Sequence, residues 1–224
     1  MFDNGFGEPL ETWDPVVADV ALFARVVTYD RAEIGKSEKA AEPRSFRVIA
    51  TELHTLLHRT NIAPPYVLVG HSMGGANIRA FALLYKDEVA ALVFVDPFSE
   101  SVFRRLGKRE RDSTAIQLDS ARTARAGKIA ESTLIRNETL NDFPELTSFG
   151  KPPEVPMMLL IAGKNRPAHW SRSVMDQYGA WMFDATMARI IYTSGAGHYI
   201  HRDDPALVVD AIHQTVRMLS GSHE

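Results

Sequence analysis

The sequence of 224 residues contains no cysteine. This absence excludes disulfide bonds, thiolate zinc sites, iron–sulfur clusters and a cysteine nucleophile. A large excess of positive or negative charge is also absent, since the chain has 25 lysines and arginines and 28 aspartates and glutamates. The formal net charge of −3 therefore gives no overall attraction to nucleic acid. The longest strongly apolar run, residues 89–95, is far too short to span a bilayer.

The first seven residues, 1–7, contain no basic stretch followed by an apolar one, so no secretory signal is visible. We therefore expect a cytoplasmic protein with no membrane span and no nucleic-acid partner. The length favours a single domain, or one domain with a modest insertion.

Apolar segments without inside–outside alternation are separated by segments with helical periodicity. Strands are predicted at 25–29, 66–69, 90–95, 156–162 and 189–192, and helices at 12–22, 45–57, 73–86, 171–184 and 205–219. This order is typical of a parallel sheet that is covered by helices on both faces. The predicted fold class is α/β, with a doubly wound, mostly parallel sheet.

Residues 97–154 separate two predicted strands and are too many for an ordinary connection in such a fold. We interpret them as a small helical cap inserted into a core formed by 1–96 and 155–224.

The motif Gly70-His71-Ser72-Met73-Gly74 lies between an apolar strand and a helix start rich in small residues. Glycines on both sides allow a strained turn that lifts the Ser72 hydroxyl above the sheet. The following helix start directs the Met73 amide toward developing negative charge. The sequence therefore predicts Ser72 as a nucleophile and Met73 as an oxyanion donor.

Five ordered motifs resemble the α/β-hydrolase family, and in particular its esterase-type members. They are Asn4-Gly5, Tyr29-Asp30-Arg31, Gly70 to Gly74, Val95-Asp96-Pro97 and Gly197-His198. The resemblance extends over nearly the whole chain and implies an α/β-hydrolase fold. Relatives usually have one or two strands before the first of these motifs, so the first strands are expected to be lacking here. Either a partner chain, such as a second copy, covers that edge of the sheet, or the natural protein is longer.

The resemblance implies a catalytic base on the loop after the last strand, where His198 lies. His201 follows three residues later, and we interpret it as a surface or capping histidine. The turn of the elbow should direct the His71 side chain away from the substrate pocket.

The acid of the triad is less clearly indicated. In many relatives it follows the strand found here at 156–162, but residues 163–166 contain no carboxylate. Other relatives have it after the strand that follows the elbow helix, and Asp96 has that position. Asp96 also lies at the carboxyl end of a parallel strand, where ligands bind in open α/β sheets. Asp176 is the alternative. A second oxyanion donor is expected from the Phe6 amide, because Asn4-Gly5-Phe6 resembles the family's oxyanion loop.

A histidine pair and a set of apolar residues are further candidates for a metal site and a substrate pocket. His54 and His58 have metal-ligand spacing on a predicted helix, but no zincin glutamate lies between them. A half-buried helix face is the favoured interpretation, and no metal or other cofactor is expected. Apolar residues that could line an acyl pocket, or equally pack into the core, are Phe98, Phe103, Trp170, Trp181, Met182 and, beside the predicted base, Tyr199.

These observations predict a serine hydrolase of carboxylic esters with small to medium acyl chains. Ser72 would attack the ester, His198 would move the proton and Asp96 would hold the imidazole. A lactonase with the same triad is one alternative. A hydrolase-like protein that binds a ligand without appreciable turnover is another.

Overall fold

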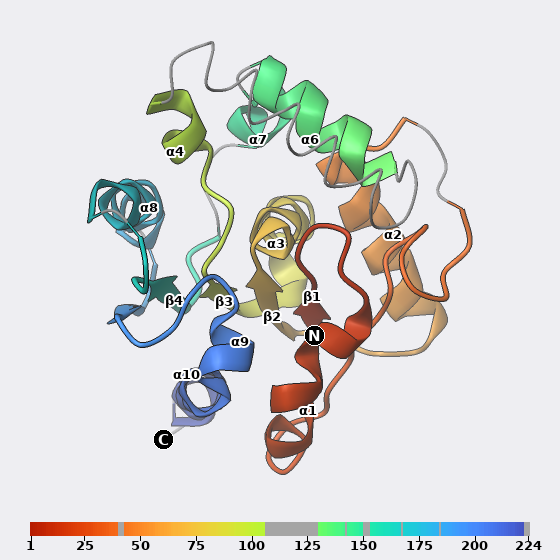
Figure 1. Ribbon diagram of the computed structural model, residues 1–224. Coiled ribbons are helices and arrows are strands. Elements are labelled where there is room, and N and C mark those ends of the chain that lie inside the picture. Colours follow the sequence, from red (N-terminus) through yellow and green to blue (C-terminus); the bar gives the residue numbers. More distant parts are fainter. Residues whose placement is uncertain are drawn as a thin grey trace.

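The computed structural model describes residues 1–39, 43–105, 130–141, 143–149, 153–166, 168–183 and 185–221. A parallel five-stranded sheet forms its centre, and strands that follow one another in the chain are neighbours in the sheet (Figure 1). The strands are β1 (Phe2–Asp3), β2 (Tyr66–His71), β3 (Val89–Val95), β4 (Met157–Ala162) and β5 (Ala188–Thr193). The predicted α/β fold with a parallel sheet is confirmed.

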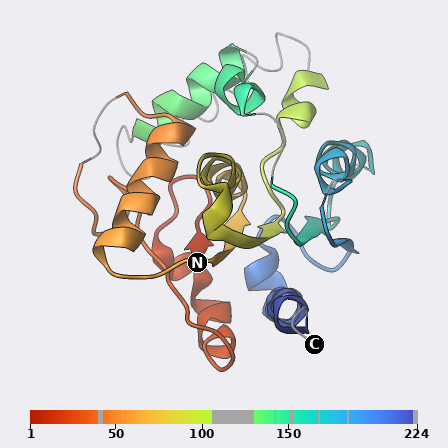
Figure 2. The same ribbon diagram turned by 180° about the vertical axis from the view of Figure 1, so that it is seen from behind.

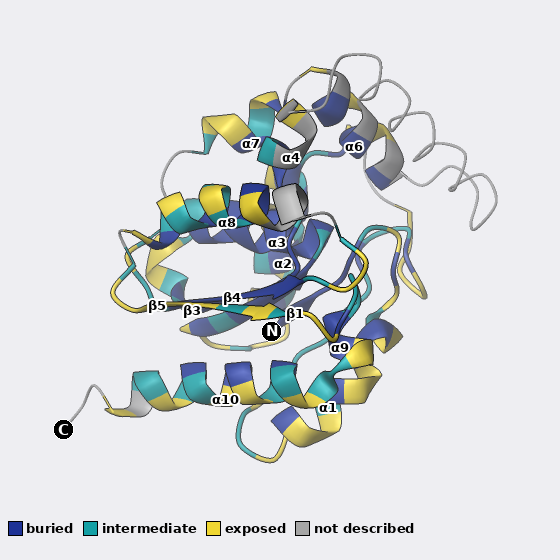
Figure 3. Cartoon of the chain, turned by 60° about the vertical axis from the view of Figure 1, so that its left-hand side comes forward, coloured by how far each residue is buried: buried dark blue, intermediate teal, exposed yellow. Residues whose placement is uncertain are grey.

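Helices cover both faces of this sheet (Figure 3). One face carries α1 (Asp14–Val20), α9 (Ile200–Asp203) and α10 (Pro205–Ser220). The other carries α2 (Phe46–Arg59), α3 (Met73–Leu84) and α8 (Ala168–Met182). Two short 3-10 helices, η1 (Leu10–Trp13) and η2 (Lys86–Glu88), precede α1 and β3.

The absence of alternation in the strands follows from these two layers. In β3, Leu92 and Phe94 pack into the core on the α2, α3 and α8 side, whereas Val93 and Val95 pack into the core on the α1 and α10 side. All four side chains are fully buried. Both faces of the strand exclude water, so both must be apolar.

The segment at 25–29 is not a strand, contrary to the sequence-based prediction. Its Val27 carbonyl accepts one hydrogen bond from the Phe2 amide, at 2.9 Å. The neighbouring strand β1 has only two residues, which leaves little backbone for a ladder. The β-branched and aromatic composition that favoured a strand here reflects packing against the two cores instead.

Between β3 and β4, the described parts of the chain contain the helices α4 (Glu100–Arg105), α6 (Ala130–Leu140) and α7 (Pro144–Ser148). They lie together beyond α2 and α3, on the far side from α10 (Figure 2). The Glu145 carboxylate on α7 accepts hydrogen bonds from the amides of Phe46 and Arg47, in the first turn of α2. This contact satisfies two amides that have no partner within their own helix. The boundaries of a cap at 97–154 stay a prediction.

None of the helices in the described ranges combines the length and apolar character that a membrane crossing requires.

Candidate active site

Ser72 occupies the sharp turn between β2 and α3, with φ 51° and ψ −119°. This is a strained conformation for a residue with a side chain. The glycines of the motif allow the turn, since a Cβ on Gly70 would lie 2.5 Å from the Gly74 carbonyl oxygen. The strain leaves the Ser72 side chain partly exposed, while His71 and Met73 on either side are buried.

His198 lies on the loop between β5 and α9 and faces Ser72. Its Nε2 is 3.0 Å from the Ser72 Oγ, and its Nδ1 is 2.5 Å from the Oδ2 of Asp96. When Nδ1 carries the proton and donates it to Asp96, the Nε2 lone pair is free to accept the serine proton. The structure thus brings together the three residues that the sequence analysis selected for a triad.

Asp96 directly follows β3 and has a positive φ of 44°. Its side chain is 1 % exposed, and Oδ1 accepts a hydrogen bond from the Ala162 amide at the end of β4. Two neighbouring parallel strands therefore hold the carboxylate at their carboxyl ends, as expected for an open α/β sheet. The alternative acid, Asp176, lies on the exposed side of α8, beside Arg79 and Gln177.

Arg166 is a site residue that the sequence analysis missed. Its Nη1 and the Asp96 Oδ1 are 2.9 Å apart, and its Nη2 and the Asp96 Oδ2 are 2.5 Å apart. The same Nη2 lies 3.1 Å from the His198 Nδ1. The Asp96 carboxylate therefore contacts both the Arg166 cation and the candidate base, His198. The signal in the sequence was an arginine in the turn after β4, which is the turn where many relatives carry the acid.

The loop at residues 4–7 approaches the start of α3. A Cβ on Gly74 would lie 2.2 Å from the Asp3 carbonyl oxygen and 2.7 Å from the Asn4 carbonyl oxygen, so only glycine allows this approach. The Met73 amide lies in the first turn of α3, where helix amides have no partner within the helix. Phe6 follows Gly5 in the approaching loop and is half-buried.

Arg31 binds this loop from behind. It is fully buried and donates hydrogen bonds to the carbonyl oxygens of Asn4 and Gly5, each at 2.7 Å. Its charge is balanced by Asp3 at 2.8 Å and by Glu131 of α6 at 2.5 Å. Glu131 also accepts a hydrogen bond from the Gly7 amide. One helix from the segment after β3 thus helps to hold the predicted oxyanion loop.

A buried polar cluster lies behind the nucleophile. His71 contacts Glu8 through Nδ1, at 3.2 Å, and the His198 carbonyl oxygen through Nε2, at 3.0 Å. Its ring centroid lies 4.7 Å from that of His198, and the orientation of its side chain away from a substrate pocket stays a prediction. Burial lowers the pKa of His71, although Glu8 partly opposes this shift. Burial alone would raise the pKa of Glu8, but the contacts with His71 and Arg202 outweigh it and lower that pKa.

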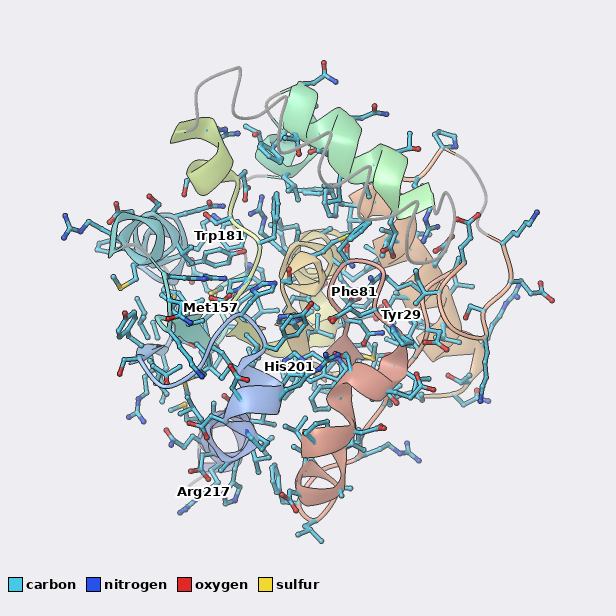
Figure 4. All side chains as sticks on the ribbon, viewed as in Figure 1. Tyr29, Phe81, Met157, Trp181, His201 and Arg217 are labelled. Atoms are coloured by element: carbon cyan, nitrogen blue, oxygen red, sulfur yellow. The ribbon has the colours of Figure 1, made fainter. Side chains whose placement is uncertain are left out.

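His201 belongs to the same cluster and is fully buried, so its interpretation as a surface histidine was wrong. It lies on α9, and its Nε2 is 3.1 Å from the Oγ1 of Thr12 on η1 (Figure 4). Its ring packs against Trp13 with the centroids 4.6 Å apart. Burial, reinforced by His71, lowers the pKa of His201 to about 3. It is neutral at physiological pH and does not contact Ser72.

The predicted pocket residues have different surroundings. The Phe98 amide donates to the Ser72 carbonyl oxygen at 2.8 Å, and the Tyr199 ring lies 5.3 Å from the His198 ring. Trp181 packs against Phe94 and stacks on the Arg79 guanidinium, and Met182 is buried in the core. The side chains of Phe103 and Trp170 lie outside the described residues.

The described residues that could jointly bind a metal ion are away from the triad, at His54, His58 and Glu88.

A sequence model of the alpha/beta hydrolase fold matches residues 2–114, which is half of the chain. The chain belongs to the alpha/beta hydrolase fold family. It is 36 % identical over 97 residues to the uncharacterized protein YqjL of Bacillus subtilis. That match covers 43 % of this chain and 38 % of YqjL, so the chain spans well under two thirds of this relative.

Solved structures of the same fold align with nearly all of the chain. A thermophilic esterase from Thermogutta terrifontis has a TM-score of 0.65 at 20 % identity, with 97 % of this chain and 89 % of the esterase covered. The enol-lactonase from Burkholderia xenovorans has a TM-score of 0.68 at 18 % identity, with 96 % and 90 % covered. At these identities, the similarity establishes the fold.

Proposed function

We propose that this protein is a serine hydrolase that cleaves carboxylic esters of small to medium acyl chains through an acyl-enzyme. The observation that carries this proposal is the continuous contact from Ser72 Oγ to His198 Nε2, and from His198 Nδ1 to Asp96 Oδ2. These are the contacts that a serine needs to lose its proton during attack and that the histidine needs to hold it.

In the first half of the reaction, the Ser72 oxygen attacks the acyl carbon while its proton moves to His198 Nε2. The carbonyl oxygen becomes an oxyanion, which the amides of Met73 and Phe6 stabilise. The tetrahedral intermediate collapses as His198 gives its proton to the departing alkoxide. The products of this half are an alcohol and the acyl ester of Ser72.

In the second half, water attacks the acyl-enzyme and gives a proton to His198. A second tetrahedral intermediate collapses, the proton returns to the Ser72 oxygen and the carboxylic acid leaves. Asp96 stays ionised in both halves, keeps the proton of the neutral imidazole on Nδ1 and stabilises the imidazolium. No cofactor has a part in these steps.

Two alternatives have support of their own. A lactonase would use the same residues on a cyclic ester, and an enol-lactonase shares this fold. A ligand-binding protein with negligible turnover is favoured by Arg166, which neutralises much of the Asp96 charge that would otherwise stabilise an imidazolium.

The deciding experiment compares hydrolysis of p-nitrophenyl acetate and p-nitrophenyl butyrate by the wild type and by Ser72→Ala. The proposal expects turnover in the wild type and only background hydrolysis in the variant. Equal rates in both proteins would refute it and favour the binding protein. Rates on lactones and acyclic esters of equal chain length distinguish a lactonase from an esterase.

A further inference from the structure

Two histidines and a glutamate from separate segments meet on the surface opposite α10. His54 and His58 are one helical turn apart on the second half of α2, and Glu88 ends η2. Their potential ligand atoms all lie within 4.8 Å of one another. The sequence alone showed only the histidine pair, because the third residue comes from 30 positions further along the chain.

The spacing of these atoms suits one metal ion. The Glu88 Oε1 lies 2.9 Å from the His54 Nε2 and 3.4 Å from the His58 Nε2. Around a tetrahedral zinc ion, ligands bound at about 2.1 Å lie about 3.4 Å from one another. Zinc could therefore replace the two imidazole–carboxylate hydrogen bonds if the His54 ring moved by a few tenths of an ångström.

The surroundings of His54 and Glu88 favour metal binding. The Tyr85 ring stacks on the His54 imidazole, with the centroids 3.9 Å apart and the planes 8° from parallel. The Glu88 Oε2 is buried and has no hydrogen-bond partner among the described residues. A carboxylate oxygen in that state is stabilised by a nearby cation. His58 is half-exposed, which gives an ion access from solvent.

The site is remote from the candidate triad. Glu88 directly precedes β3, whereas Asp96 directly follows it. The seven residues of this strand span about 20 Å. A metal ion at Glu88 would therefore link α2 to the turn before β3 and would have no part in ester hydrolysis.

We propose that His54, His58 and Glu88 form a binding site for a divalent transition-metal ion, with Zn²⁺ as the preferred ion and water as its fourth ligand. Two imidazoles and one carboxylate are a ligand set that zinc commonly takes. Mg²⁺ and Ca²⁺ prefer oxygen ligands and should bind poorly. This site is independent of the proposed hydrolase activity.

The test is calorimetric titration of the full chain, freed of metal by chelator and dialysis, with zinc chloride. We expect one saturable site with micromolar affinity in the wild type. In the double variant His54→Ala/His58→Ala this site should be lost, and Glu88→Gln should weaken it by at least tenfold. Magnesium chloride at the same concentration should give no saturable binding. With Co²⁺, the wild type should show the strong visible absorption of a four-coordinate ion.

The matched control is His213→Ala, which removes an exposed histidine on α10, outside the cluster. It should bind zinc like the wild type. Since His58 is half-exposed, His58→Ala should fold even if the double variant does not, and it should also weaken binding at least tenfold. The proposal is overturned if zinc binds His58→Ala and Glu88→Gln with the stoichiometry and affinity of the wild type, or if the wild type binds none.

Discussion

Arg166 donates hydrogen bonds to both carboxylate oxygens of Asp96, and one of these oxygens also contacts His198. The Asp96 side chain is 1 % exposed, so it interacts with Arg166 and His198 where water is largely excluded. A guanidinium beside the carboxylate makes a positive charge on His198 less favourable. It also fixes the plane of the carboxylate through two parallel hydrogen bonds. In the proposed mechanism, Arg166 is therefore a positioning residue that acts on His198 through Asp96.

Replacing Arg166 with methionine should lower kcat for ester hydrolysis by about tenfold. The variant loses the two hydrogen bonds that fix the plane of the Asp96 carboxylate, so the carboxylate holds the His198 ring less firmly. Rates of p-nitrophenyl butyrate hydrolysis measure the change. Arg172→Met, on the exposed side of α8, is the matched control. Equal kcat values for the wild type and Arg166→Met would show that Arg166 does not position the acid.

Asp96→Asn should lower kcat by about 10³- to 10⁴-fold, because an amide favours the wrong imidazole tautomer and cannot stabilise an imidazolium. The amide oxygen can still accept hydrogen bonds from Ala162 and Arg166, so the fold should be retained, which the melting temperature will show. Asp176→Asn is the control and should leave kcat within about twofold. Full activity in Asp96→Asn together with a large loss in Asp176→Asn would reverse the assignment of the acid.

The sequence predicted the parts of this site that depend on short-range geometry. The elbow around Ser72 needs glycines at fixed positions between a strand and a helix, and the five consecutive residues Gly70 to Gly74 meet this requirement. Asp96 was predicted from the resemblance to relatives that carry the acid after this strand, with support from its place at the carboxyl end of a parallel strand. The two faces of β3 could also be expected to be buried, since a strand covered on both sides is continuously apolar.

The contacts that the sequence could not predict join segments far apart in the chain. Arg31 meets Glu131 across 100 positions, and His58 meets Glu88 across 30. The local sequence around each of these residues does not indicate which distant residue it contacts, because tertiary packing alone brings the two together. The segment at 25–29 failed as a strand for a related reason. Its composition suits a strand, but pairing depends on the length of the neighbouring strand.

Removal of Arg31 should cost both stability and rate. Arg31→Met leaves the carboxylates of Asp3 and Glu131 buried without their cation, which should lower the free energy of unfolding by about 3–5 kcal/mol. It also frees the Asn4 and Gly5 carbonyls, so the Phe6 amide is held less firmly and kcat should fall, by up to about 10²-fold. Urea denaturation and ester hydrolysis measure the two effects.

Arg59→Met, at the exposed end of α2, is the control for Arg31→Met and should change neither quantity appreciably. Glu131→Gln keeps the contact between Arg31 and Asp3, so its effect on kcat isolates the contribution of α6 to the loop. A wild-type kcat in both Arg31→Met and Glu131→Gln would show that the loop does not need this support.

His201 should make the stability of the fold depend on pH between 7 and 5. Its pKa is about 3 in the folded protein, because of burial and then of the neighbouring His71, against an ordinary value of 6.5. The unfolded chain therefore takes up this proton more readily than the folded one. The contribution of His201 to stability is fully present above pH 6.5 and is lost as the pH falls toward 3.

From this shift, the free energy of unfolding should fall by about 2 kcal/mol between pH 7 and pH 5 through His201 alone. Urea denaturation at several pH values gives the free energy of unfolding of the wild type and of His201→Gln as a function of pH. Because glutamine does not titrate, the difference between the slopes of the two curves reports the protonation of His201. His71 titrates in both proteins, and its ring lies 4.5 Å from that of His201, so the difference includes the coupling between the two histidines. His213→Gln, on the exposed side of α10, should keep the wild-type slope. Equal slopes for the wild type and His201→Gln would mean that His201 is protonated as easily in the folded protein as in the unfolded chain.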